Sequence, residues 1–229
     1  MTPPTDAVVI DADDPRYPLR ARERLGDAAP ASIVARGNLA LLECPALVIF
    51  SSRKCPGRLI LRAYDVGQVI RARGIPIIGG FQSAAEEECR IVALRGDGPI
   101  ILCLAHDIAA WRYPSEYRAA MDAGRVLLLS PFADGPRRAD TRSAQCRDRF
   151  VAALASSVLI IHADPAGRTT ALAREVLSWG IPVCVLEDEA NAHLVKMGVR
   201  PVGVGEAGEM VPPATWSELQ TDAGAHDKD

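Results

Sequence analysis

Six short apolar runs, separated by segments with helical spacing, constrain this chain more than any other feature of its sequence. The runs are Ala46–Phe50, Ile75–Gly79, Pro99–Ala105, Arg125–Leu129, Ser157–Ala163 and Ile181–Leu186. Their length and aliphatic composition are typical of strands that are buried on both faces, as in a parallel sheet. Helical spacing of apolar residues recurs between them, in Arg58–Arg73, Ala84–Arg95, Arg142–Ala155 and Arg168–Trp179. The alternation predicts an α/β fold, a Rossmann-like and doubly wound, mostly parallel sheet of about six strands with helices on both faces.

The two ends of the chain do not follow this alternation. Residues 1–45 contain several prolines and one candidate short strand, Ser32–Ala35, so we expect an extended lead-in that packs on the core. Residues 46–205 form the Rossmann-like domain in this interpretation. Residues 206–229 are rich in Gly, Pro and acidic residues, and we expect a flexible acidic tail there.

Composition excludes several classes of protein. With 229 residues and 48% hydrophobic residues, the chain can build a sizeable core and is not disordered. No apolar run approaches the roughly 18 residues of a membrane-spanning helix, and the N-terminus does not resemble a secretory signal. Six scattered cysteines without a CxxC pair argue against a zinc site. We therefore expect a reduced, cytoplasmic protein with no membrane contact and no bound metal.

The net charge of −3 hides an uneven distribution. Residues 51–76 contain six Lys or Arg and one Asp, whereas residues 206–229 contain six acids and one Lys. A basic patch can therefore exist on an acidic chain, and phosphate binding depends on such patches rather than on the total charge. The alternative interpretation is a solvated helix face that carries arginines.

The loop from Ser51 to Gly57 is the first candidate for an anion site. Ligands bind at the carboxyl ends of the strands in doubly wound folds, and this loop follows the first strand and begins a helix. Small hydroxyl groups, two cations and a helix N-terminus are typical of phosphate sites. The candidate residues are Ser51, Ser52, Arg53, Lys54 and Gly57. A capped helix start with exposed cations is the alternative, and Cys55 beside these cations is predicted to have a lowered pKa.

Further candidates lie in the loops after the second, third and fifth predicted strands and in the helix before the fifth. Gly79 and Gly80 permit close approach of a ligand, and Ser83 with Glu86 is typical of a capping box. A second phosphate cradle is predicted at the helix start after the fifth strand. The alternatives are ordinary turns, surface arginines and a histidine without a role. The further candidate residues are Gly79, Gly80, Phe81, Gln82, Ser83, His106, Arg147, Arg149, Gly167, Arg168, Thr169 and Thr170.

Catalytic motifs are not evident. The sequence has no GxSxG elbow, no HExxH motif and no evident nucleophile–base pair. We therefore predict no catalytic residues and no cofactor, and the visible chemistry is anion binding.

Seven short motifs in order resemble one known family, the DNA-processing protein A family (DprA, also called Smf), within the wider SLOG group of Rossmann-like domains. They are Asp14-Pro15-Arg16-Tyr17-Pro18 with Arg36-Gly37-Asn38-Leu39, Ser51-Ser52-Arg53, Gly79-Gly80-Phe81, Tyr113-Pro114, Ser130-Pro131-Phe132, Arg147-Asp148-Arg149-Phe150 and Ala166-Gly167-Arg168-Thr169-Thr170-Ala171. The resemblance spans about Asp14 to Leu186.

The resemblance implies a non-catalytic protein that binds single-stranded DNA, works as a homodimer without a metal, and helps to load a RecA-type recombinase. By position, it assigns phosphate contacts to Arg53, Lys54, Arg147 and Arg149. The chain departs from the family pattern at Ser51, at Asp148 and across 84–89, where acidic residues are introduced. It resembles a divergent, stand-alone core of the family.

Two alternatives remain open from the sequence. One is a SLOG-type protein that binds or senses a small nucleotide, because two short phosphate cradles suit a compact ligand. The other is a phosphoribohydrolase, although the loop from Pro165 to Thr170 lacks the glycines and the close acid of that class, with Glu175 following late.

Overall fold

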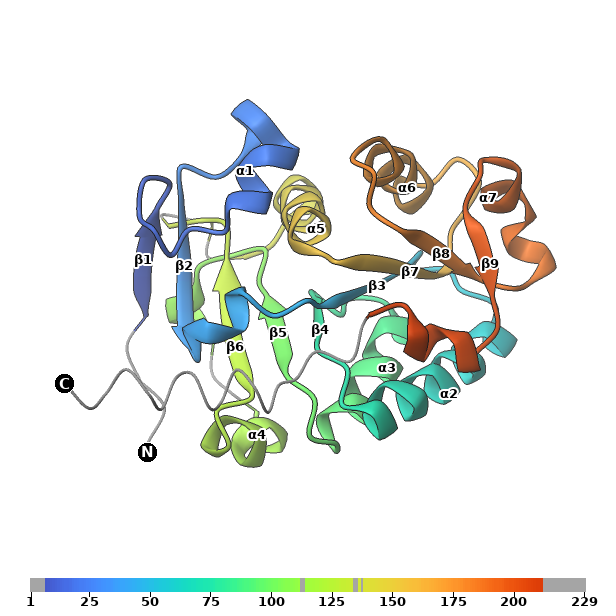
Figure 1. Cartoon of the computed structure of the whole chain (residues 1–229), viewed down its shortest axis with the longest axis horizontal. Coiled ribbons are helices and arrows are strands. Elements are labelled where there is room, and N and C mark those ends of the chain that lie inside the picture. The colour runs from blue at the N-terminus through green and yellow to red at the C-terminus, as the bar shows by residue number, and fades with distance from the viewer. Residues whose placement is uncertain (1–6, 112–113, 134–135, 137, 212–229) are drawn as a thin grey trace.

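A single nine-stranded sheet organises the computed structural model, which describes residues 7–111, 114–133, 136 and 138–211 (Figure 1). The strand order is β1-β2-β6-β5-β4-β3-β7-β8-β9, parallel from β6 to β9, with β2 antiparallel to both β1 and β6. The strands are β1 Val8–Asp11, β2 Ser32–Gly37, β3 Leu47–Ser51, β4 Ile77–Gly79, β5 Ile100–Cys103, β6 Val126–Ser130, β7 Ser157–His162, β8 Val183–Leu186 and β9 Arg200–Val202.

All six predicted strands are confirmed, but the expected number of about six strands is wrong. The sheet also contains β1, β2 and β9. β1 and β9 are short edge strands whose residues are partly exposed, so they lack the continuous apolar run of a buried strand. Pro201 lies in β9, where an edge position tolerates a residue without a backbone N–H. β2 extends the candidate short strand to Gly37.

Helices cover both faces of the sheet, as predicted. α2 and α3 pack on one face, and α1, α5 and α6 lie on the other (Figure 1). Each layer buries its own apolar cluster against the sheet. The helices are α1 Leu19–Leu25, α2 Gly57–Arg73, α3 Ala84–Leu94, α4 Arg118–Asp122, α5 Thr141–Leu154, α6 Arg168–Ser178 and α7 Ala192–Lys196.

Helix α2 carries most of the basic segment, and the structure gives these cations a structural role. Arg58 forms an ion pair with Asp188 at 2.7 Å, and Arg73 lies 3.8 Å from Glu209. Arg62 donates to the carbonyl of Glu187. The basic face of α2 therefore holds the segment around β8 and β9, and only Arg53 and Lys54 of the basic segment lie at the predicted anion site.

The strand order reverses between β3 and β7. From β3 the chain adds β4, β5 and β6 on one side, and then returns to place β7 on the other side of β3. The loops after β3 and β7 therefore leave the sheet side by side, at the kind of switch point where doubly wound folds bind ligands.

No helix among the described residues is long and apolar enough to cross a membrane. The division of the chain at residues 45 and 206 stays a prediction. Residues 212–229 of the predicted tail lie outside the described residues, as does Tyr113.

Candidate anion-binding site

A cavity of about 770 Å³ opens at the switch point between β3 and β7. Loops after β3, β4 and β7 contribute to its wall, together with α5 and the start of α6. The structure thus brings together segments that are more than a hundred residues apart in the sequence. The predicted residues that line it are Ser51, Ser52, Arg53, Lys54, Gln82, Ser83, Arg147, Arg149, Gly167, Arg168 and Thr169.

The other predicted site residues do not line the cavity. Gly79 makes room for the ring of Phe81, because a Cβ there would lie 3.2 Å from the ring. Phe81 is buried with φ +49°, which is uncommon for a bulky residue. The ring of His106 bonds the carbonyl of the next residue at 2.9 Å. Thr170 is buried and donates to the carbonyl of Asp164 at 2.6 Å.

Gly57 and Gly80, also outside the cavity lining, differ from each other in what surrounds them. Gly57 is the first residue of α2, and a Cβ there would meet no atom within 4 Å. A Cβ at Gly80 would overlap the guanidinium of Arg147. Because Gly80 has no side chain, the guanidinium of Arg147 can lie against the backbone after β4.

Ser52 joins the two predicted phosphate loops. Its N–H donates to the carbonyl of His162 at 2.8 Å, and its Oγ accepts from the N–H of Asp164 at 3.0 Å. The same Oγ lies 3.4 Å from Oγ1 of Thr169. The pairing of β3 with β7 shifts register at Ser51, as in a β-bulge, which turns this end of β3 toward the loop after β7.

Arg147 forms part of the cavity wall from a buried position. Only 3% of its side chain is exposed. Nη1 donates to the carbonyl of Cys103 at 3.0 Å, and Nε donates to Asp148 at 2.8 Å. The charge of Arg147 is thus paired within the protein, and its contact with phosphate stays a prediction.

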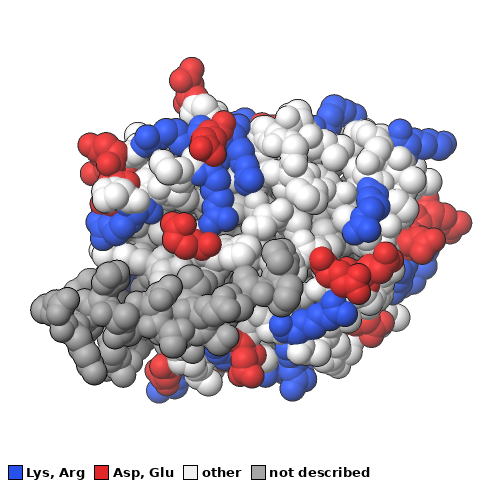
Figure 2. All heavy atoms as spheres, viewed as in Figure 1, with Lys and Arg blue, Asp and Glu red and all other residues white. Residues whose placement is uncertain are grey.

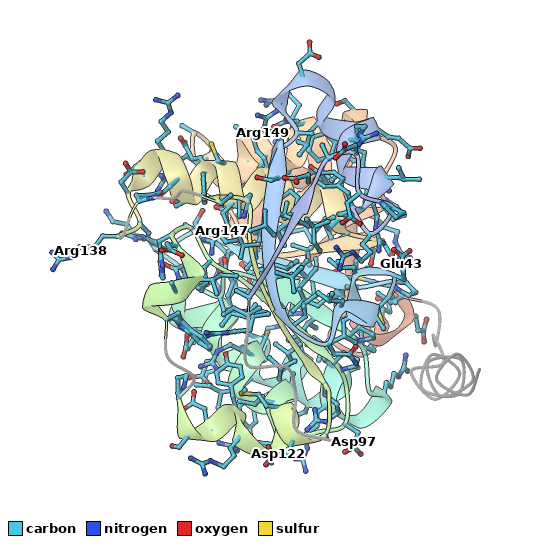
Figure 3. The ribbon with its side chains drawn as sticks, turned by 90° about the vertical axis from the view of Figure 1, so that its left-hand side faces the viewer. Glu43, Asp97, Asp122, Arg138, Arg147 and Arg149 are labelled. Atoms are coloured by element: carbon cyan, nitrogen blue, oxygen red, sulfur yellow. The ribbon has the colours of Figure 1, made fainter. Side chains whose placement is uncertain are left out.

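Arg149, two residues further along α5, is 41% exposed and lies 2.6 Å from Glu175 on α6. Figure 3 labels both arginines, with Arg147 nearer the middle of the molecule. The structure therefore separates two residues that the sequence treated as equivalent. An anion in the cavity would therefore have to compete with the carboxylate of Glu175 for the guanidinium of Arg149.

Arg53, Lys54 and Arg168 supply exposed positive charge at the cavity, and the charge of Arg168 also acts on the carboxyl of Asp148. All three are exposed, and none makes an ion pair with another described residue. Arg168 begins α6, a helix of 11 residues whose N-terminal N–H groups favour anions. On the face shown in Figure 2, basic and acidic side chains are intermixed.

Glu86 is the residue that sequence reasoning missed as part of this cavity. The predicted capping box with Ser83 is confirmed. The carboxylate does more, because Oε1 accepts from the N–H of Ser51 and Oε2 from the N–H of Gln82, both at 2.8 Å. Glu86 therefore binds the loops after β3 and β4 to each other. The capping-box pattern identifies Glu86 as a residue that caps α3, but no local pattern predicts its hydrogen bond with Ser51, which lies 35 residues away.

Burial dominates the electrostatics of Glu86. Only 8% of the residue is exposed, and burial raises its pKa to about 7, with Asp148 adding to the rise. The N–H groups of Ser51 and Gln82 and the charge of Arg147 act in the opposite direction. Glu86 therefore changes charge near neutral pH, unlike an exposed carboxyl.

A stability profile tests this titration. Because the folded protein retains a proton that the unfolded chain loses above its ordinary pKa of 4.5, the free energy of unfolding should fall as pH rises from 4.5 to about 7. Glu86 contributes up to about 1.4 kcal/mol per pH unit. Urea denaturation of the wild type and of Glu86→Gln across this range should give profiles of different slope. Parallel profiles would contradict the shifted pKa.

The predicted activation of Cys55 is not found. This half-buried thiol has its pKa raised by burial, and Asp188 adds to the rise. A hydrogen bond with Ser51 acts in the opposite direction but is the smaller effect. Burial therefore outweighs the nearby cations and the helix start on which the prediction rested.

The fold and the cavity define a doubly wound α/β protein with a cavity lined by exposed cations at the switch point of its sheet. The chain belongs to the DNA recombination-mediator protein A family, whose model matches residues 8–205. This confirms the family to which the sequence motifs pointed. A comparison with curated proteins finds no match.

Solved structures support the same fold. DNA processing protein A from Streptococcus pneumoniae matches with a TM-score of 0.71 and 20% identity, over 89% of this chain and 73% of that chain. DNA processing protein A from Helicobacter pylori, whose structure describes a single-stranded DNA binding mode, matches with a TM-score of 0.68 and 17% identity, over 96% and 97% of the two chains. The molybdenum cofactor carrier protein of Chlamydomonas reinhardtii matches with a TM-score of 0.50 and 19% identity, over 78% and 99%.

Proposed function

We propose that this protein binds the sugar–phosphate backbone of single-stranded DNA in the cavity at the switch point, as a non-catalytic member of a DNA-processing or recombination pathway. The observation that carries the proposal is the position of Arg53, Lys54 and Arg168 at one cavity without ion-pair partners among the described residues. The hydroxyls of Ser52 and Thr169 and the start of α6 lie in the same wall. Such groups position phosphates without reading sequence.

Family membership supports this proposal. The Helicobacter pylori protein has a single-stranded DNA binding mode and matches nearly the whole chain. Homodimer formation, the loading of a RecA-type recombinase and a cytoplasmic location also belong to the proposal, and they rest on the family resemblance.

Mutation of the unpaired cations tests the proposal directly. Fluorescence anisotropy with a labelled ~20-nucleotide oligothymidylate should show binding that weakens steeply with salt, because each neutralised phosphate of a single strand contributes a slope of about 0.7. Arg53→Ala should weaken binding several-fold and lower the slope. The Arg53, Lys54 and Arg168 triple alanine variant should abolish binding at physiological salt.

The control is Arg58→Ala, in the same basic segment of the sequence. Arg58 forms its ion pair with Asp188 and does not line the cavity. Its variant should bind as the wild type does. Equal losses in Arg58→Ala and Arg53→Ala would place the DNA elsewhere, and absence of binding at low salt would refute the proposal.

A small nucleotide is the second candidate ligand, and one observation favours it. The cavity lining carries nearly balanced charge, with cations at Arg53, Lys54, Arg147, Arg149 and Arg168 and carboxylates at Glu86, Asp148, Asp164 and Glu175. Carboxylates suit the donors of a base or a sugar better than a bare phosphate chain. A nucleotide that raises the melting temperature in proportion to its concentration, where DNA does not, would favour this alternative.

Phosphoribohydrolase activity receives no support from the geometry. Glu175, the acid that follows the loop after β7, is bound by Arg149. Release of free base from a nucleoside monophosphate would nevertheless establish it.

A further inference from the structure

Glu86 is the one carboxylate of the cavity wall that is buried and tied to the backbone of two ligand-facing loops. Its oxygens accept from Ser51 and Gln82 at 2.8 Å and from Ser83 at 3.4 Å. It lines the same cavity as the free cations Arg53 and Lys54. An ionised Glu86 therefore places a negative charge, poorly screened by water, next to the position proposed for phosphate.

We propose that anion binding in this cavity is coupled to the uptake of one proton by the Glu86 carboxylate. The inference rests on the proposed function and adds its regulation by pH. The proton comes from solvent and neutralises the carboxylate, so the cavity loses up to one unit of negative charge when the ligand enters. No bond other than the O–H bond forms or breaks.

The charged groups around Glu86 favour such a step. Asp148 on α5 lies near Glu86 and disfavours a second negative charge, whereas Arg147 on the same helix favours it. Cys89 on α3 is buried. Burial raises the pKa of its thiol and the charge of Glu86 adds to the rise, so the thiol stays neutral. Among the described residues, Arg147 is the basic side chain that acts on the Glu86 carboxylate, and it is already bound to Asp148.

The coupling between proton binding at Glu86 and anion binding sets the direction in which affinity changes with pH. In the free protein the pKa of Glu86 is raised to about 7 by burial. A bound phosphate raises it further by repulsion, so the complex holds the proton at pH values where the free protein has lost it. Affinity should be highest below pH 7 and should fall as pH rises toward the pKa of the complex, by up to about tenfold per pH unit.

Two histidines lie near the cavity, so the experiment has to distinguish them from Glu86. His162 at the end of β7 has its Nε2 3.8 Å from Asp164, which lines the cavity. His193 bonds Oγ1 of Thr170 at 3.2 Å, and its pKa is lowered by burial and by the nearby His162.

Isothermal titration calorimetry with the full chain measures the proton directly. The probe is an oligothymidylate of ~20 nucleotides with a 5′-hydroxyl, because thymine and phosphodiesters do not titrate between pH 6 and 8.5. Titrations at pH 7.5 in Tris and in HEPES, which differ in heat of ionisation, should show uptake of a measurable fraction of one proton. The dissociation constant should rise three- to tenfold between pH 6.5 and pH 8.

The variants assign the proton to its residue. Glu86→Gln should take up no proton and give a dissociation constant independent of pH, whereas His162→Gln should behave as the wild type. Proton uptake that persists in Glu86→Gln and is lost in His162→Gln would overturn the inference while leaving the proposed function intact. Wild-type binding without proton uptake would do the same. Absence of oligothymidylate binding at every pH would overturn both. If Glu86→Gln is too unstable to titrate, the inference is still overturned by wild-type binding without proton uptake or by loss of the uptake in His162→Gln.

Discussion

Replacement of Arg147 by methionine should lower the free energy of unfolding by about 2–3 kcal/mol, because it removes the charged partner of the buried carbonyl of Cys103 and of the partly exposed carboxylate of Asp148. Arg147 is 3% exposed, bonds the carbonyl of Cys103 and pairs with Asp148. Methionine keeps much of the side-chain volume, so the loss reports mainly charge and hydrogen bonds rather than a cavity. Urea denaturation followed by circular dichroism measures the change.

Arg149→Met is the matched control on the same helix. Arg149 is 41% exposed, and its ion pair with Glu175 is open to water. Exposed ion pairs stabilise by at most about 1 kcal/mol, so this variant should lose no more than that. Equal losses from the two variants would show that Arg147 is not the buried anchor that the structure describes. DNA binding by Arg149→Met should change little if Glu175 already holds this cation.

Replacement of Gly80 by alanine should have the second large effect. The added methyl would overlap the guanidinium of Arg147, which is fixed by Cys103 and Asp148 and cannot yield without losing these bonds. Overpacking of a filled interior costs about 1–3 kcal/mol, and displacement of the arginine adds to it. We expect a lower midpoint of urea denaturation, because the arginine would lose its bonds to Cys103 and Asp148.

Gly57→Ala is the matched control, since both glycines were predicted site residues. Gly57 begins α2 in open space, so the change should alter the free energy of unfolding by less than about 1 kcal/mol. A double variant, Gly80→Ala with Arg147→Met, should cost less than the sum of the single changes, because both remove the same contacts. Additive losses would contradict the contact between Gly80 and Arg147.

The sequence by itself determined the parallel core of the sheet, its covering helices and the family. Each of the six central strands is a short aliphatic run, and such runs are recognisable because both faces are buried. The capping box at Ser83 and Glu86 is equally local. The edge strands β1 and β9 were not predicted, because a strand with partly exposed residues has no continuous apolar run.

The tertiary structure alone decided which charges are free. Arg53, Arg58 and Arg147 look alike in the sequence, yet Arg58 binds Asp188, Arg147 binds Cys103 and Asp148, and Arg53 has no ion-pair partner among the described residues. Asp188 lies 130 residues from Arg58 and Cys103 lies 44 residues from Arg147, so no local pattern reveals these two contacts, whereas Asp148 directly follows Arg147. The charge of a site depends on distances in space and on exclusion of water, and both are set only when the chain is packed.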